Sequence, residues 1–424
     1  MKRRAETRPG TQGGSGATPP LAQVLGPLVG GMTATRQNLL EWVHTVGVIA
    51  LDEVFREEAA ARAGPKGQHD AARTHHHWGR TARELTFGGR RLSVPCPRVR
   101  STAGREATLP SVAAFRGRDP LTTRVMDQLL LGISSRGYAR SLEGAPAGGR
   151  SRGSSKSAVS RVVVARTRAH LAAQLERRLD GLALLALFVD GVVVAGQTVI
   201  VALGVTQTGT KEPLGLCLGS TENAAVCTHL LQDLLARGLP IDGRVLCVID
   251  GGKGLRKALD DVLGAAAVIQ RCQLHKRRNV DALVPKVRHA YVRATMRRAY
   301  RASTAAAARR QLTALATWLE HTGHPDAAAS LREGLDETLT VLKLGLPPTL
   351  RRFFATTNCI ENLIGTLRHV ARPVKRWRGG EMIRRWVGLG LVQARARFRR
   401  IKHHGELAAL ATALRADTAS EHAA

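Results

Sequence analysis

The chain has 424 residues, with 64 Lys and Arg against 33 Asp and Glu, so its net charge at pH 7 is +31. This positive excess predicts a polyanionic partner such as nucleic acid. With 44% hydrophobic residues the chain is not a disordered basic tail. It lacks an apolar run of about 18 residues, which argues against a membrane span.

The first twenty residues, MKRRAETRPGTQGGSGATPP, are basic and have no apolar segment. This composition predicts a disordered leader over residues 1–20 instead of a secretory signal. The six cysteines are scattered and mostly lie in apolar runs. We therefore expect free thiols in a reducing compartment, the cytoplasm.

Residues 21–120 predict a helical region with a small β-hairpin. The stretch LLEWVHTVGVIALDEVFREEAAARA has helical spacing, and ELTFGGRRLSVPCPRVR predicts two strands joined by a Gly-Gly turn. His75 to His77 lie in an expected loop between these elements. Three histidines raise the possibility of a metal site, but no nearby cysteine or carboxylate completes one, which favours a solvated loop.

Residues 121–180 predict a helix-turn-helix-like DNA-binding domain. PLTTRVMDQLLLGISSRGYARSLEG has the pattern of a helix, a turn and a helix, and a third helix capped by Ser157 follows. An ordinary solvated helix pair explains this pattern equally well. The basic residues expected on the exposed face of the third helix are Lys156, Arg161, Arg166 and Arg168.

Residues 181–277 predict the first part of an α/β core with a mixed five-stranded sheet. Three antiparallel strands are followed by a helix, a strand, a second helix and a last strand. The first helix is expected to begin at Thr221 and end at Gly238. Because a helical crossover precedes the fourth strand, this strand should lie parallel to the first. The predicted strands are 182–190, 197–209, 211–219, 243–250 and 266–272.

Residues 278–345 predict an all-α insertion, since this segment is rich in Ala and Arg and loses strand character. Residues 346–405 should complete the core, and 406–424 form a C-terminal tail. From residue 368 to 402 there are twelve Lys and Arg against one acid, Glu381, on a helical pattern that ends in RARFRRIKHH. A solvated basic face is one reading, and a track for DNA phosphates is the other. The basic residues expected to contact DNA here are Arg376, Arg395, Arg397 and Arg400.

Asp190 and Asp250 end two strands predicted to be parallel neighbours. Two ionised carboxylates at adjacent strand ends repel unless a cation lies between them, and carboxylate oxygens suit Mg²⁺ or Mn²⁺. The alternative is that each Asp only starts a turn, since VDG and VIDGG are good turn sequences. Glu361 is the best third acid, ahead of Glu222 and Asp233.

The stretch ATTNCIENLIGT predicts a helix start at residues 355–366. Asn358 and Glu361 have the spacing of a capping box, in which the cap and the third residue satisfy each other's backbone donors. This role does not exclude metal binding, because a cap fixes the direction of the carboxylate.

The segments GLCLGSTEN, LLQDLLARGL, VIDGGKGL, IQRCQLHKRRNV and ATTNCIENL occur in this order over about residues 180–400. Together they resemble the Mutator-type bacterial insertion-sequence transposases, which are DDE transposases with a ribonuclease-H-like fold. The resemblance implies a catalytic and metal-binding triad of Asp190, Asp250 and Glu361. Cys272, His275, Asn279 and Asn358 match motif positions.

The resemblance also implies two Mg²⁺ or Mn²⁺ ions and phosphoryl transfer on double-stranded DNA, at the element's terminal inverted repeats and at the target. It further implies a homodimer or higher assembly on DNA, in the bacterial cytoplasm at the nucleoid. Cys272 and His275 have the spacing of half a zinc site. No second pair follows, which favours a structural pair over zinc.

Two further sequence features have a chemical and a structural reading. Cys359, beside the expected triad glutamate, is either a nucleophile or a packed thiol, and its apolar neighbours favour packing. DGGKGL lacks the spacing of a phosphate loop, so nucleotide binding is not expected.

Two other functions stay open at this stage. One is a different ribonuclease-H-like nuclease, such as a junction resolvase. The other is a DNA-binding regulator derived from a transposase that has lost catalysis. A Mg²⁺-dependent nicking assay separates the regulator from both enzymes.

Overall fold

The computed structural model describes residues 36–68, 70–87, 90–117, 123–142, 151–219, 223–241 and 243–421. The chain divides into two compact units, residues 1–163 and 164–424. The expected leader, the Gly-Gly turn of the hairpin and Glu222 lie outside the described residues. No helix in the described part of the chain combines the length and apolar character needed to cross a membrane.

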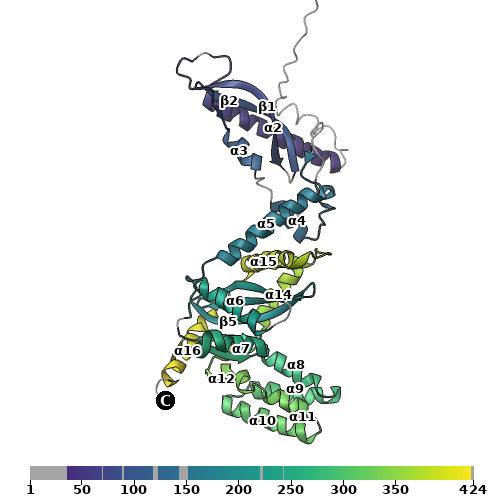
Figure 1. The fold of residues 1–424 in the computed structure, drawn as a ribbon, viewed down its shortest axis with the longest axis vertical. Helices are drawn as coiled ribbons and strands as arrows, with labels where there is room; N and C mark the ends of the chain where they lie inside the picture. Colours follow the sequence, from purple (N-terminus) through teal and green to yellow (C-terminus); the bar gives the residue numbers. More distant parts are fainter. Residues whose placement is uncertain are drawn as a thin grey trace, which may run out of the picture. The chain divides into compact units, whose positions relative to one another are not determined.

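The first unit contains a long helix packed on an antiparallel hairpin (Figure 1). Helix α2 (Arg36–Ala63) places Leu51, Phe55, Ala59 and Ala63 on one stripe, because these residues are four apart. Strand β2 (Arg90–Ser101) alternates buried and exposed side chains from Arg90 to Cys96. Both expected elements are therefore confirmed. The remaining strands of this sheet are β1 (His75–Phe87), β3 (Glu106–Ala107) and β4 (Ser151–Arg152).

Two details of this unit differ from the sequence prediction. His75 to His77 begin strand β1 instead of lying in a loop, because they pair with Ser101, Arg100 and Val99 of β2. Helices α3 (Pro110–Gly117) and α4 (Thr123–Leu130) follow. The second helix expected after α4 is a single 3-10 turn, η1 (Tyr138–Ser141).

Helix α5 (Lys156–Glu176) runs from the first unit into the second. Its cap is Ser155, whose Oγ accepts a hydrogen bond of 3.3 Å from the backbone N–H of Ala158. The expected cap, Ser157, is wrong because this residue already lies inside the helix. Arg168 of α5 pairs with Glu381 at 3.0 Å, within the second unit.

The second unit is built on a five-stranded sheet in the order β7-β6-β5-β8-β9. β5, β6 and β7 are antiparallel, whereas β8 pairs with β5, and β9 with β8, in parallel. This arrangement confirms the mixed sheet and the parallel fourth strand. The strands are β5 (Leu184–Val194), β6 (Gln197–Thr206), β7 (Lys211–Gly219), β8 (Val245–Ile249) and β9 (Ala267–Arg271).

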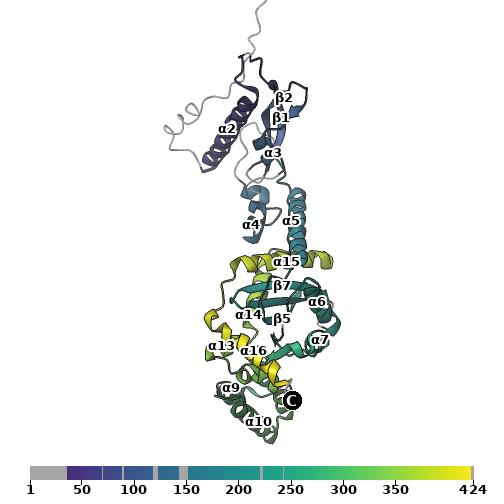
Figure 2. The ribbon, with the colours of Figure 1, turned by 90° about the vertical axis from the view of Figure 1, so that its left-hand side faces the viewer.

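Helices cover both faces of this sheet (Figure 2). Leu187 and Val189 of β5 face a core shared with α6 (Ala224–Ala236) and α7 (Lys253–Leu263). Their neighbours Phe188 and Val192 belong to the opposite core, under α14 (Asn358–Ala371) and α15 (Gly379–Arg397). Side chains alternate along a strand, so Asp190 points to the face that α14 covers.

Helix α6 begins later than expected. Asn223 is its cap, because the Asn223 Oδ1 accepts from the backbone N–H of Val226 at 3.0 Å, so the prediction of Thr221 is wrong. Gly238, which has a φ of +83°, follows the end of the helix as predicted.

Between β9 and α14 the chain forms only helices over residues 273–343, here called the helical segment. It has its own core, which includes Val292, Leu312, Leu319 and Leu331. The loss of strand character expected in this region is therefore confirmed. Its helices are α8 (Gln273–Ala282), α9 (Lys286–Tyr300), α10 (Ala305–His321), α11 (Pro325–Arg332), η3 (Asp336–Leu339) and α12 (Thr340–Lys343).

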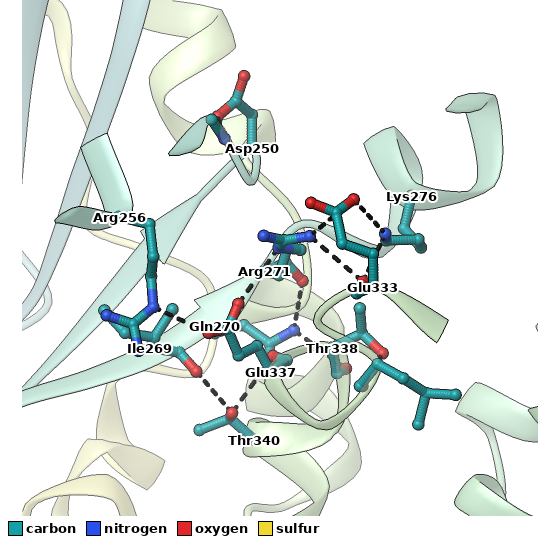
Figure 3. A network of polar contacts seen from close by, with 12 residues as sticks. Asp250, Arg256, Ile269, Gln270, Arg271, Lys276, Glu333, Glu337, Thr338 and Thr340 are labelled. Carbon is teal, nitrogen blue, oxygen red and sulfur yellow. Dashed lines mark hydrogen bonds and ion pairs between the residues drawn. The ribbon is translucent and has the colours of Figure 1, made fainter. Parts of the chain in front are cut away.

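A largely buried ionic network ties the helical segment to the sheet edge (Figure 3). Arg271, at the end of β9, pairs with Glu337 at 3.2 Å, and Arg256 of α7 pairs with the same carboxylate at 2.8 Å. The ammonium group of Lys276 donates to the carbonyl oxygen of Glu333 at 2.7 Å, and only 2% of its side chain is exposed. Removing the Glu337 carboxylate would leave the buried guanidinium of Arg271 without this ion pair, which is destabilising.

Arg271 also supports the loop after Asp250. Gly251 has a φ of +106°, and a Cβ at this residue would lie 2.8 Å from the Arg271 Nε. The arginine therefore packs against a backbone position that only glycine fills without strain.

Gly251→Ala should lower the free energy of unfolding by about 1–3 kcal/mol, because it adds backbone strain and displaces Arg271. Gly243→Ala, just before the same strand, is the matched control. Gly243 has a φ of +87° but open space around its Cβ position, so its loss should be smaller. Urea unfolding followed by circular dichroism measures both. Equal losses would mean that the Arg271 contact contributes nothing.

Candidate active site

Asp190 and Asp250 lie level on neighbouring parallel strands. The register pairs Phe188 with Val248, so the residues two positions further along each strand are Asp190 and Asp250. The prediction that Asp190 ends its strand is wrong, because β5 continues to Val194 and Asp190 pairs with Val201 of β6. Asp250 does follow the last residue of β8.

Both aspartates also hydrogen-bond to the backbone that follows them. The Asp190 Oδ1 accepts from the N–H of Gly191 at 2.8 Å, and the Asp250 Oδ1 accepts from the N–H of Gly252 at 2.9 Å. The contact of Asp250 is an Asx turn, so its turn-forming role is real. Each contact uses one carboxylate oxygen.

Glu361 lies in the first turn of α14, over the same sheet face as Asp190. Ile360 and Leu363 pack into the core that contains Phe188, which fixes the rotation of this helix. The helix begins at Asn358 and its cap position is Thr357, so the expected capping box of Asn358 and Glu361 is wrong. The helix starts one residue early, and the Thr357 hydroxyl donates directly to the Glu361 Oε1 at 3.2 Å.

His275 lies beside Glu361. Its Nε2 lies 3.8 Å from the Glu361 Oε1. The pKa of His275 is raised, first by its hydrogen bond with Cys272 and further by the negative charges of Cys272, Asp250 and Asp190. The imidazole therefore lies near Glu361, and the charges of the two aspartates add to the rise of its pKa.

Cys272 holds the start of α8 against the start of α14. Its Sγ accepts from the backbone N–H of His275 at 3.5 Å and from the N–H and the hydroxyl of Thr357, each at 3.4 Å. Burial alone would raise the pKa of Cys272, but the hydrogen bonds from His275 and Thr357 outweigh it and the pKa is lowered. These contacts orient the helix that carries Glu361. Asn279, by contrast, is exposed further along α8.

Cys359 is a packed thiol. It is buried in the core beneath α14, and this burial raises its pKa to about 12. A thiol with that pKa is protonated at neutral pH, which contradicts a nucleophilic role.

The donor set fits a hard divalent cation, since it consists of carboxylate oxygens. Among the residues that the structure describes, however, no three His, Cys, Asp or Glu side chains converge closely enough to hold a metal ion. Of the competing acids, Asp233 pairs with Arg237 at 3.0 Å on α6.

The profile of the family described as "Transposase, Mutator family" matches residues 33–400. This chain belongs to the Mutator family of transposases. The match extends across both compact units.

Several relatives of this Mutator-family chain carry related names. "Transposase for insertion sequence element IST2" of Acidithiobacillus ferrooxidans is 30% identical over 202 residues, covering 45% of this chain and 67% of that protein. "Probable transposase for insertion sequence element" of Corynebacterium diphtheriae is 31% identical over 183 residues, covering 43% and 52%. "Transposase for insertion sequence element ISRM3" of Rhizobium meliloti is 30% identical over 208 residues, covering 49% and 50%. This chain thus spans about half the length of the latter two relatives.

The basic residues expected to contact DNA have different environments. Lys156 and Arg161 are exposed on α5, and Arg376 is exposed between α14 and α15. Arg166 is half-buried. Burial lowers the pKa of His170, and the positive charge of Arg166 lowers it further. Arg395 pairs with Glu212 of β7 at 2.9 Å.

The helical pattern expected over residues 368–402 is divided between two helices and does not reach residue 402. Helix α14 ends at Ala371, and α15 ends at Arg397. Phe398 is extended, and its ring packs under the Lys211 ammonium group, at 4.6 Å from the ring centre. Arg397 and Arg400 are both exposed but do not share a helix face.

Sequence reasoning missed two residues that support the site, Thr357 and Arg271. Thr357 is fully buried and directly precedes Asn358. The run Thr-Thr-Asn therefore contained the actual cap position, one residue before the predicted one. Arg271 had no such signal, because its partners Glu333 and Glu337 are distant in sequence.

Thr357→Val should lower the free energy of unfolding by about 1–3 kcal/mol, because it removes a buried hydroxyl that Cys272 and Glu361 share. Thr357→Ser should recover most of this loss. Thr366→Val is the control on the same helix: the Thr366 hydroxyl bonds only the Asn362 carbonyl at the surface, so a change within about 0.5 kcal/mol is expected. Thermal unfolding compares the three, and a harmless Thr357→Val would remove Thr357 from the site.

Proposed function

We propose that this chain is a transposase that binds the ends of an insertion sequence, cleaves the DNA there and joins it to target DNA. The observation that carries the proposal is the level placement of Asp190 and Asp250 on parallel neighbours, with Glu361 above the same sheet face. Family membership supports the reaction class, and the names of the relatives support insertion sequences as substrates.

The catalytic core is proposed to be ribonuclease-H-like, with the helical segment as its insertion. The sheet order β7-β6-β5-β8-β9, in which the first three strands are antiparallel and the last two parallel, supports this assignment. The separate core of the helical segment supports its treatment as an insertion.

Asp190, Asp250 and Glu361 would hold Mg²⁺ or Mn²⁺, which supplies Lewis-acid activation of the attacking and leaving oxygens in phosphoryl transfer. The rest of the site orients these acids. Thr357 and His275 fix Glu361 from two sides, and Gly252 fixes Asp250. Water and then a DNA 3′-hydroxyl attack the phosphorus, and the bond to the leaving oxygen breaks at each step.

DNA phosphates are proposed to meet the exposed arginines. Phosphate contacts position DNA without reading its sequence, whereas side chains of a recognition helix reach the bases. Lys156 and Arg161 on α5 are the candidates for end recognition, and Arg376, Arg397 and Arg400 for phosphate binding.

Asp190→Ala, Asp250→Ala and Glu361→Ala should each reduce Mg²⁺-dependent nicking of duplex DNA by more than about a thousandfold, as when one member of a catalytic set is removed. DNA affinity should change little. Glu361→Gln is sharper, because an amide oxygen can still accept from Thr357 but carries no charge. Asp233→Ala is the matched control and should nick normally. Wild-type nicking by Glu361→Gln would contradict the ligand role.

Lys156→Ala with Arg161→Ala should weaken binding to the element's ends more than binding to random duplex. Arg62→Ala with Arg105→Ala removes the same charge from exposed sites of the first unit and should reduce both affinities equally. Substitutions in the full chain are preferable to a truncation at residue 180, because Arg385 of α15 donates to Thr167 of α5 in a buried contact. Unchanged end preference in the Lys156/Arg161 variant would place recognition elsewhere.

A further inference from the structure

A cleft of about 650 Å³ lies between the helical segment and the start of α14. Its walls come from α8, α9 and α13 (Pro348–Phe354). Met296, Tyr300 and Leu342 contribute apolar surface, and none of the fifteen lining residues is acidic. Five arginines line it: Arg277, Arg297, Arg301, Arg351 and Arg352.

These five guanidinium groups are not neutralised by the protein. Within the described ranges none of them forms an ion pair, and the one hydrogen bond from their side chains runs from Arg351 to the carbonyl oxygen of Ala302, at 3.4 Å. The Nε of Arg277 is buried without a hydrogen-bond partner.

Three other arginines of the helical segment are paired. Arg293 pairs with Asp281 at 2.8 Å, and Arg309 and Arg332 pair with Asp336 and Glu320. The segment therefore has acids but places them away from the cleft.

Five like charges around one cleft repel one another. Bound anions would relieve it. Arginine is suited to phosphate, since its planar fork donates two parallel hydrogen bonds. Because the arginines come from three separate helices, they fit several phosphates along a chain better than one compact anion.

The cleft adjoins the candidate active site. Thr356 and Asn358 line it, and they flank Thr357, whose hydroxyl donates to Glu361. An anion in the cleft therefore lies beside the first turn of the helix that carries the third acid.

We propose that this cleft binds the sugar–phosphate backbone of the DNA strand next to the phosphate that is cleaved. The inference rests on the proposed function, since it assigns the path of the substrate strand beyond the three acids. It adds a phosphate site that is separate from α5 and from the arginines after α15.

The test measures the affinity of the full chain for a 30-base-pair duplex of random sequence at several salt concentrations, with EDTA present. Arg297→Ala with Arg301→Ala should make the slope of log affinity against log salt shallower by up to about 1.8, since each lost phosphate contact removes about 0.9. Arg352→Gln, on the opposite wall, should remove up to about 0.9. Both substitutions concern exposed side chains, so the fold should persist, and circular dichroism checks this.

The matched control is Arg298→Ala with Arg310→Ala, which removes the same charge from exposed, unpaired arginines of the helical segment that do not line the cleft. Its slope should stay close to wild type. An unchanged slope in both cleft variants, or an equal change in the control, would overturn the proposal. Because binding in EDTA requires no chemistry, this result is independent of nicking in Mg²⁺, which tests the proposed function.

Discussion

The parallel pairing of β5 with β8 is the constraint on which the candidate site depends. A parallel neighbour requires a crossover, and α6 supplies it between β7 and β8. The pairing of Phe188 with Val248 then brings Asp190 and Asp250 level, although the helix and two strands separate them in sequence. Side-chain alternation along β5 turns Asp190 toward the face under α14. A slip of one residue would point it to the opposite core.

The second requirement is that the end of the helical segment return to this sheet face. Arg271, Arg256 and Lys276 bind the turn after α11 through Glu333 and Glu337, so the segment is fixed to the edge formed by β9 and α7. At the neighbouring start of α8, Cys272 accepts hydrogen bonds from Thr357. The helical segment therefore leaves the sheet and returns to it at neighbouring positions. The arginine-lined cleft lies along this junction.

The sheet order could be predicted because each strand is a continuous apolar run with clear turns between strands, and the acids followed from that order. The start of α14 could not be fixed, since Thr356, Thr357 and Asn358 are all competent caps and tertiary contacts with Cys272 and His275 favour Thr357. Ion pairs between residues distant in sequence could not be predicted either, because local sequence patterns do not report them. Arg395 of α15 pairs with Glu212 of β7, and α15 ends before Phe398, whose ring contacts Lys211, whereas the local sequence favours a longer basic helix.

The most direct test of the central claim is Mn²⁺ binding to the full chain, followed by electron paramagnetic resonance without DNA or turnover. If Asp190, Asp250 and Glu361 share one cation site, the wild-type protein should bind Mn²⁺. Alanine at any of the three should weaken binding by at least about tenfold, because each carboxylate supplies a negative charge and a coordinating oxygen. Asp233→Ala should bind as the wild type does. Undiminished Mn²⁺ binding in Asp190→Ala and Asp250→Ala would contradict the account, because the β5–β8 register would then place no metal ligands.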